Sequence, residues 1–99
     1  MTYLVRLTRT IPFQRPVMTQ FRASSEYLLD VRREAAQRLV SGTGDRQTAK
    51  AEIFRATAWG DDLIGVLHYI KPEEPLVWSP IKGYPYRCNL DGTLGEVAL

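Results

Sequence analysis

Cysteine and histidine are scarce in this chain of 99 residues, which contains one of each, Cys88 and His68. A lone cysteine cannot form an intramolecular disulfide, so the class of small disulfide-stapled domains is excluded. A metal site needs three or four ligands at recognisable spacing, and one histidine with one cysteine does not supply them. We therefore expect no metal, no cofactor, and a reducing compartment such as the cytoplasm.

Long apolar segments are also absent. The longest run, Leu63 to Leu67, is far shorter than the roughly 20 residues that a helix needs to cross a bilayer. Arg6 and Arg9 interrupt the stretch where the apolar part of a secretory signal would lie. The chain is the length of one domain, so we expect a single cytoplasmic domain over residues 1–99 with no membrane partner.

Acidic residues are missing from the first 25 positions, which contain four arginines. Residues 51–75 carry five acids against one arginine and one lysine, and the whole chain has a net charge of +2. Such a chain has too few carboxylates to imitate DNA, and it is less basic than a nucleic-acid coat protein.

Two alternating segments predict a hairpin at the N-terminus. Residues 3–9 and 17–23 each place apolar and polar side chains on opposite faces with a period of two, which is typical of strands. Pro12 and Pro16 bracket the turn between them, since proline donates no ladder hydrogen bond.

The period then changes to that of a helix. Ser24 or Ser25 is placed to cap the N-terminus, and Gly42 is placed to end the helix. The apolar stripe that should face the sheet consists of Leu28, Val31, Ala35 and Leu39.

Residues 50–59 fit either a helix, because of their alanines, or a strand. We choose a strand, because Gly60-Asp61-Asp62 is a turn signal and a second strand, 63–70, follows. Extended pieces are expected at 76–78 and 84–90, with a turn at Asp91-Gly92. The predicted fold is α+β: an antiparallel sheet of four or more strands with one helix packed on one face, in the order β-β-α-β-β plus C-terminal extended segments.

No catalytic motif is evident, and we predict that the protein is not an enzyme. Ile64, Val66, His68 and Ile70 should share one strand face, which makes His68 a histidine at the edge of the core. The G-x-G at 42–44 follows a helix, whereas a phosphate-binding glycine loop precedes one.

Two segments are candidate partner-binding surfaces. The basic hairpin could contact phosphates or an acidic protein patch, or it could simply be a solvated face. The proline-rich segment near the C-terminus carries aromatic and arginine side chains of the kind that anchor interfaces, although Trp78 and one tyrosine could instead complete the core. The candidate residues are Arg6, Arg15, Arg22, Trp78, Tyr84, Tyr86 and Arg87.

Four features define a recognisable layout: Tyr3-Leu4 in the first strand, the segment 21–25 entering the helix, His68-Tyr69 in the second hairpin, and the late segment 83–86. This layout resembles that of small proteins of phages and other mobile elements, including type I anti-CRISPR proteins. The resemblance covers most of the chain in outline, but the connection 72–80 departs from it. It implies a stoichiometric inhibitor without catalytic residues that occupies a CRISPR effector surface in the host cytoplasm.

We therefore expect a non-enzymatic binding protein, with two alternatives for its partner. The first is a viral protein of phage type that inhibits a type I CRISPR effector complex. The second is a small nucleic-acid-binding accessory protein that uses the arginine-rich hairpin. A nucleic-acid binder should lose affinity steeply with salt, whereas an inhibitor should form a stoichiometric complex with a protein assembly.

Overall fold

The computed structural model describes residues 2–42, 48–69 and 76–98. These residues form one α-helix and seven β-strands. The elements in chain order are β1 (Tyr3–Thr10), β2 (Val17–Arg22), α1 (Leu28–Gly42), β3 (Thr48–Thr57), β4 (Gly60–Tyr69), β5 (Leu76–Pro80), β6 (Tyr86–Cys88) and β7 (Leu94–Val97). The predicted α+β class with an antiparallel sheet is confirmed, and the sheet is larger than its two hairpins because the C-terminal segments also join it.

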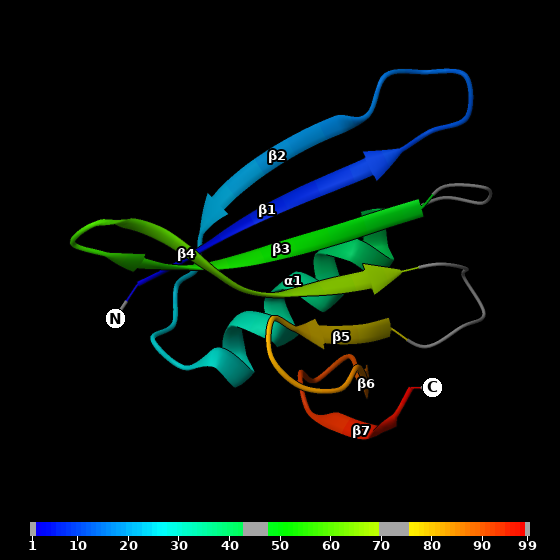
Figure 1. The fold of residues 1–99 in the computed structure, drawn as a ribbon. Coiled ribbons are helices and arrows are strands. Elements are labelled where there is room, and N and C mark those ends of the chain that lie inside the picture. The colour runs from blue at the N-terminus through cyan, green and yellow to red at the C-terminus, as the bar shows by residue number, and fades with distance from the viewer. Residues whose placement is uncertain (1, 43–47, 70–75, 99) are drawn as a thin grey trace.

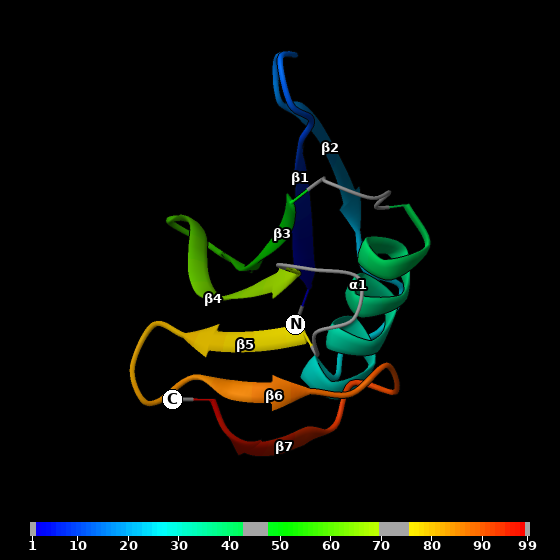
Figure 2. The ribbon, with the colours of Figure 1, turned by 90° about the vertical axis from the view of Figure 1, so that its right-hand side faces the viewer.

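The sheet has the strand order β2-β1-β3-β4-β5-β6-β7, and every neighbouring pair is antiparallel (Figure 1). The helix lies on one side of it, against β1, β3 and β4 (Figure 2). We call the opposite side, which faces the viewer in Figure 1, the open face. β2 and β7 form the two edges of the sheet.

Both predicted hairpins are present, and residues 50–57 are a strand. The second turn lies earlier than expected: Ala58 and Trp59 form it, and β4 already starts at Gly60. The Thr57 hydroxyl accepts a hydrogen bond from the Trp59 N–H at 3.2 Å, and Gly60 takes a φ of 126°. Because glycine adopts this φ easily, the hairpin closes there, and Asp61 belongs to β4 and not to the turn.

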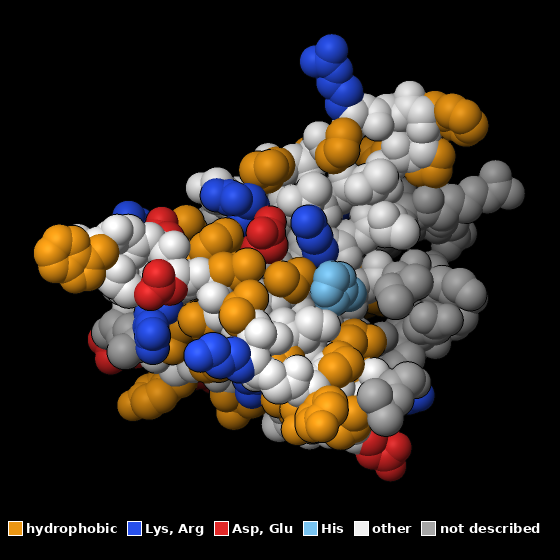
Figure 3. Space-filling model, in the orientation of Figure 1, with side chains coloured by type: hydrophobic (Ala, Val, Ile, Leu, Met, Phe, Trp, Pro, Cys, Tyr) orange, Lys and Arg blue, Asp and Glu red, His pale blue; other side chains and the backbone are white. Residues whose placement is uncertain are grey.

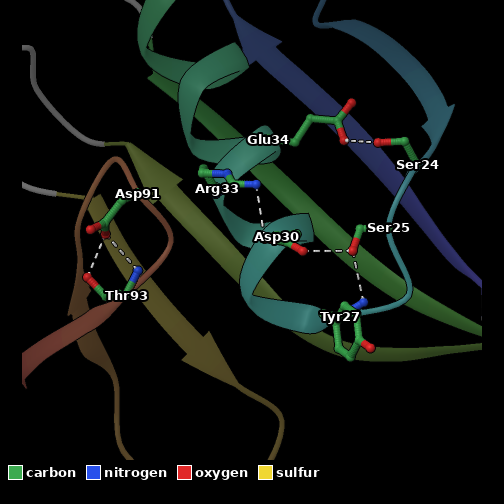
Figure 4. A network of polar contacts seen from close by, with 8 residues as sticks. All are labelled: Ser24, Ser25, Tyr27, Asp30, Arg33, Glu34, Asp91 and Thr93. Carbon is green, nitrogen blue, oxygen red and sulfur yellow. Dashed lines mark hydrogen bonds and ion pairs between the residues drawn. The ribbon is translucent and has the colours of Figure 1, made fainter.

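The predicted serine cap is displaced: the Tyr27 carbonyl accepts the first helical hydrogen bond, and Ser25 lies in the turn two residues before it (Figure 4). The Ser25 hydroxyl accepts a hydrogen bond from the Tyr27 N–H at 3.1 Å and donates one to Asp30 at 2.9 Å. Asp30 also forms an ion pair with Arg33 at 3.0 Å, and its charge is favourable in the first helical turn. The predicted stripe faces the sheet: Leu28 is half-buried, and the buried members are Val31, Ala35 and Leu39.

The core lies between the helix and the sheet. The helix supplies aliphatic side chains, while β1, β4 and β5 also supply aromatic ones. The fully buried side chains of greatest volume are Leu39, Ile53, Leu67, Val5 and Val31.

A β-bulge changes which side chains of β4 face the core. The pairing of β3 with β4 shifts after Ile53, which leaves Ile64 as the extra residue. Ile64 packs against the core on the helix side of the sheet. Val66 and His68, which come directly before and after buried Leu67, lie on the open face. The expectation that Ile64 shares a face with them is therefore wrong, and Ile70, the fourth member of that set, lies outside the described residues.

The turn between β6 and β7 is docked on the helix. Gly92 has a φ of 89°, and a Cβ at this position would lie 2.3 Å from the Leu29 carbonyl oxygen, so only glycine allows this approach. The Arg32 Nε–H donates a hydrogen bond to the Gly92 carbonyl at 3.0 Å. In the same turn Asp91 accepts hydrogen bonds from the Thr93 hydroxyl at 2.5 Å and from the Thr93 N–H at 3.0 Å, and both lower the pKa of the Asp91 carboxyl (Figure 4). The predicted turn at Asp91-Gly92 is confirmed.

Candidate binding surface on the open face

One row of side chains crosses five strands on the open face. The register pairs each member with the next, and paired residues of neighbouring strands point to the same side of a sheet. With strands about 4.8 Å apart, the row extends about 19 Å over its four steps. Its members, in order across the sheet, are Thr8, Lys50, His68, Val77 and Arg87.

Two further rows lie beside the first. Arg6 pairs with Glu52, which continues across the sheet to Val66 and Ser79, and Leu4 pairs with Phe54. The Arg6 guanidinium lies 5.0 Å from the centre of the Phe54 ring, an attractive cation–π arrangement. The Arg6 Nε is buried and has no hydrogen-bond partner among the described residues.

Basic side chains of the open face form no ion pair in the described parts of the chain. Both ion pairs found there lie on the helix, Arg33 with Asp30 and Arg38 with Glu34 at 3.3 Å. Figure 3 shows lysine and arginine side chains spread over the open face. The cations that the register places there are Arg6, Arg22, Lys50 and Arg87, and Glu52 is the acid among their rows.

A hollow of about 290 Å³ opens at the end of the first row, where β1 ends and β3 begins. Hydroxyl, ammonium and imidazole groups line it, and all of these can donate hydrogen bonds. An anion is the ligand that such a donor set suits. The lining residues are Thr8, Thr10, Thr48, Ala49, Lys50, His68 and Tyr69.

His68 does not add a charge to this surface at neutral pH. Burial lowers the pKa of its imidazole, and the neighbouring Lys50 ammonium lowers this pKa further. The neutral ring can still donate one hydrogen bond and accept another. The sequence indicated a histidine at the edge of the core; His68 is half-buried, and the strand register places it on the open face.

The arginines predicted from the sequence fall in several places. The register places Arg6, Arg22 and Arg87 on the open face, in β1, β2 and β6. Arg15 is exposed in the loop between β1 and β2, so it extends the basic surface beyond the strands.

The predicted aromatic anchors are separated from one another. Tyr84 is exposed in the loop between β5 and β6, whereas Tyr86 is half-buried and pairs with Trp78. Trp78 is only 4% exposed and lies 5.5 Å from the Arg32 guanidinium. Its place is therefore in the core, which was the other role that the sequence left open for it.

The open-face residues that were not predicted as binding residues include Lys50, Phe54 and His68. The alternation of Lys50, Glu52 and Phe54 was visible in the sequence, but residues 50–59 fitted a helix as well. Their closeness to Arg6 and Arg87 depends on the strand register, which no local pattern reveals.

The described residues contain neither a metal-binding cluster nor an exposed cysteine. No group of three or more His, Cys, Asp or Glu side chains there is placed to hold a metal ion. Cys88 is buried, and burial raises the pKa of its thiol although the nearby Arg32 opposes this. A thiol with a raised pKa is a poor nucleophile at neutral pH.

Comparisons with known proteins return no match: no family model, no curated protein and no solved structure is similar to this chain. Within residues 2–42, 48–69 and 76–98, no helix is long and apolar enough to cross a membrane.

Proposed function

We propose that this protein is a non-enzymatic binding protein that holds single-stranded nucleic acid on its open face. The proposal rests on one observation: Arg6, Lys50 and Arg87 lie in adjoining rows of one sheet face and form no ion pair with a described residue. Phosphate contacts by lysine and arginine supply most of the affinity of a sequence-tolerant nucleic-acid binder.

Single strands fit this surface better than a duplex. Reading a duplex requires an element that enters a groove, usually a helix. The exposed side of α1 is unsuited to this, because Asp30 and Glu34 neutralise Arg33 and Arg38. A single strand can instead lie across a sheet and stack its bases on aromatic rings, and half-exposed Phe54 lies in that position beside Arg6.

Inhibition of a type I CRISPR effector remains a prediction from the sequence layout alone. The basic open face is also compatible with an acidic protein surface, so the experiment includes both kinds of partner. An inhibitor should bind the purified effector complex at a fixed stoichiometry and bind free nucleic acid poorly.

The test compares two double variants that lose the same charge from opposite sides of the sheet. Lys50→Gln with Arg87→Gln removes cations of the open face, and Arg33→Gln with Arg55→Gln removes exposed cations on the helix side. Binding to a labelled single-stranded oligonucleotide is measured by fluorescence anisotropy over a range of salt. We expect the open-face variant to bind more weakly, with a salt slope smaller by about 0.7 per lost phosphate contact.

The matched variant should retain both the affinity and the salt slope of the parent protein. Equal losses in the two variants would show that net charge, and not the open face, governs binding. Poor binding of the parent protein to oligonucleotide, together with a stoichiometric complex on a type I effector, would replace our proposal with the inhibitor function.

A further inference from the structure

The two edges of the sheet differ in how they are protected. β7 is short, carries Glu96, and its pairing with β6 is irregular. Charges, short length and bulges are the means by which proteins prevent an edge strand from pairing with another chain. β2 has six residues in unbroken register with β1, no proline within it, and one charged residue, Arg22, at its end.

Hydrogen bonding leaves one set of β2 backbone groups unpaired. The Ala23 N–H donates to the Tyr3 carbonyl at 2.9 Å, which fixes the phase of the ladder between β1 and β2. In an antiparallel ladder alternate residues bond to the neighbour, so the odd-numbered residues of β2 bond to β1. The N–H and C=O groups that point outward are therefore those of Met18, Gln20 and Arg22.

Apolar side chains accompany this free backbone. Val17 is 46% exposed and Met18 is 57% exposed, although both lie in a regular strand. The helix packs on β1, β3 and β4, and in Figure 1 β2 lies at the margin of the sheet. Among the described residues, nothing pairs with this edge.

We propose that β2 of one copy pairs antiparallel with β2 of a second copy, about a two-fold axis at Gln20. In this register Gln20 faces Gln20 of the second copy and Met18 faces its Arg22, so no like charges are opposed. Each of the three outward-pointing pairs exchanges two main-chain hydrogen bonds, and Val17 comes to lie opposite Ala23. The same strand thus supplies both halves of a self-complementary interface.

A foreign strand is a weaker candidate for this edge. The two-fold register needs no partner sequence beyond β2 itself, and it brings the only charge of the strand opposite an apolar residue. Because the axis is perpendicular to the sheet, the open faces of the two copies lie on the same side of one continuous sheet.

The test places like charges on the two-fold axis. Sedimentation velocity over a range of concentrations should give the mass of two 11.3 kDa chains for the parent protein and of one chain for Gln20→Lys. Gln20→Glu alone should also be monomeric, but an equimolar mixture of Gln20→Lys and Gln20→Glu should dimerise, because opposite charges then meet. The matched control is Gln37→Lys, which makes the same change at an exposed position of α1 and should leave the dimer intact.

Backbone protection gives a second measurement that does not depend on a variant. Amide hydrogen exchange at Met18, Gln20 and Arg22 should slow as the protein concentration rises, while exchange at Thr19 and Phe21, already bonded to β1, should change little. A parent protein that stays monomeric at high concentration, or a Gln20→Lys variant that stays dimeric, would falsify the pairing. If the parent protein dimerises but the mixture of the two charged variants stays monomeric, Gln20 does not face Gln20 across the interface and the proposed two-fold register is overturned.

Discussion

Gly65 leaves room for Trp78, the largest side chain of the core. A Cβ at this position would lie 2.4 Å from the ring of Trp78, a distance that packed atoms do not reach. The ring therefore occupies the space that a side chain on β4 would fill, and the Arg32 guanidinium stacks 5.5 Å from it. This close approach explains why Trp78 became a core residue, although its neighbourhood in the sequence resembles an interface segment.

Substitution of Gly65 tests this packing. We expect Gly65→Ala to lower the free energy of unfolding by about 1–3 kcal/mol, because the added methyl group forces Trp78 out of its position. The tryptophan emission should also shift to longer wavelength as the ring gains contact with water. Both quantities can be read from one urea titration followed by fluorescence.

Gly95→Ala is the matched control, since a Cβ there meets no atom closer than 3.7 Å. Its effect should remain within about 0.5 kcal/mol, which is usual for surface changes. An equal loss in both variants would mean that the glycine backbone, and not the tryptophan, is responsible.

At the scale of elements, the structure was predictable where the sequence pattern is local and long. The helix and the first hairpin were correctly placed because a stripe of period 3.6 and two alternating runs define them within single segments. β6 has three residues and lies within a predicted extended piece, whereas β7, with four residues, was not predicted as a strand. The bulge in β4 and the position of Trp78 depend on how distant strands align, which the sequence does not state.

The candidate binding surface was likewise predictable only where its residues belong to one local sequence pattern. Arg6 and Arg22 could be placed on the outer face of the first hairpin, because they alternate with apolar residues. Lys50, His68 and Arg87 can be assigned to the same face only when the order of six strands in the sheet is known. Proximity across a sheet is a non-local property, so the closeness of these three residues to Arg6 became visible only in the structure.

The attachment of β7 to the rest of the fold gives an element-scale prediction. Gly92→Ala should detach the turn between β6 and β7 from α1, because a Cβ would collide with the Leu29 carbonyl and the Arg33 amide. The hydrogen bond from Arg32 to the turn should then be lost as well. Hydrogen exchange at residues 94–97 should become faster, whereas exchange in β1 and β3 should change little.

Gly60→Ala is the control that distinguishes the strain of a positive φ from the collision of a Cβ with α1. Gly60 also has a positive φ, 126°, but a Cβ there meets nothing within 4 Å. It should lower overall stability without a selective increase of exchange in β7. If exchange at residues 94–97 rises equally in both variants, the docking of the turn is not what holds β7.

At the scale of the whole molecule, the open face and the unpaired edge of β2 together affect how a long nucleic-acid strand would bind. The rows of the open face run across the strands, and β2 lies at one end of them. Pairing of two copies through β2 would therefore extend the rows from one copy into the next. A long single strand could contact both basic faces, while a short one could contact only one.

This arrangement predicts a length dependence that the edge controls. We expect the parent protein to bind an oligonucleotide of about 30 nucleotides at least tenfold more tightly than one of about 8, because the second contact is intramolecular.

Gln20→Pro removes the outward-pointing N–H at the two-fold axis without changing the charge, and an edge strand tolerates proline there. The variant should keep the affinity of the parent protein for the short oligonucleotide and lose most of the gain for the long one. Anisotropy titrations with both lengths measure this, and circular dichroism checks that the variant is folded. A gain that survives in folded Gln20→Pro would mean that each copy binds the strand independently, since longer strands also offer more binding registers to a monomer.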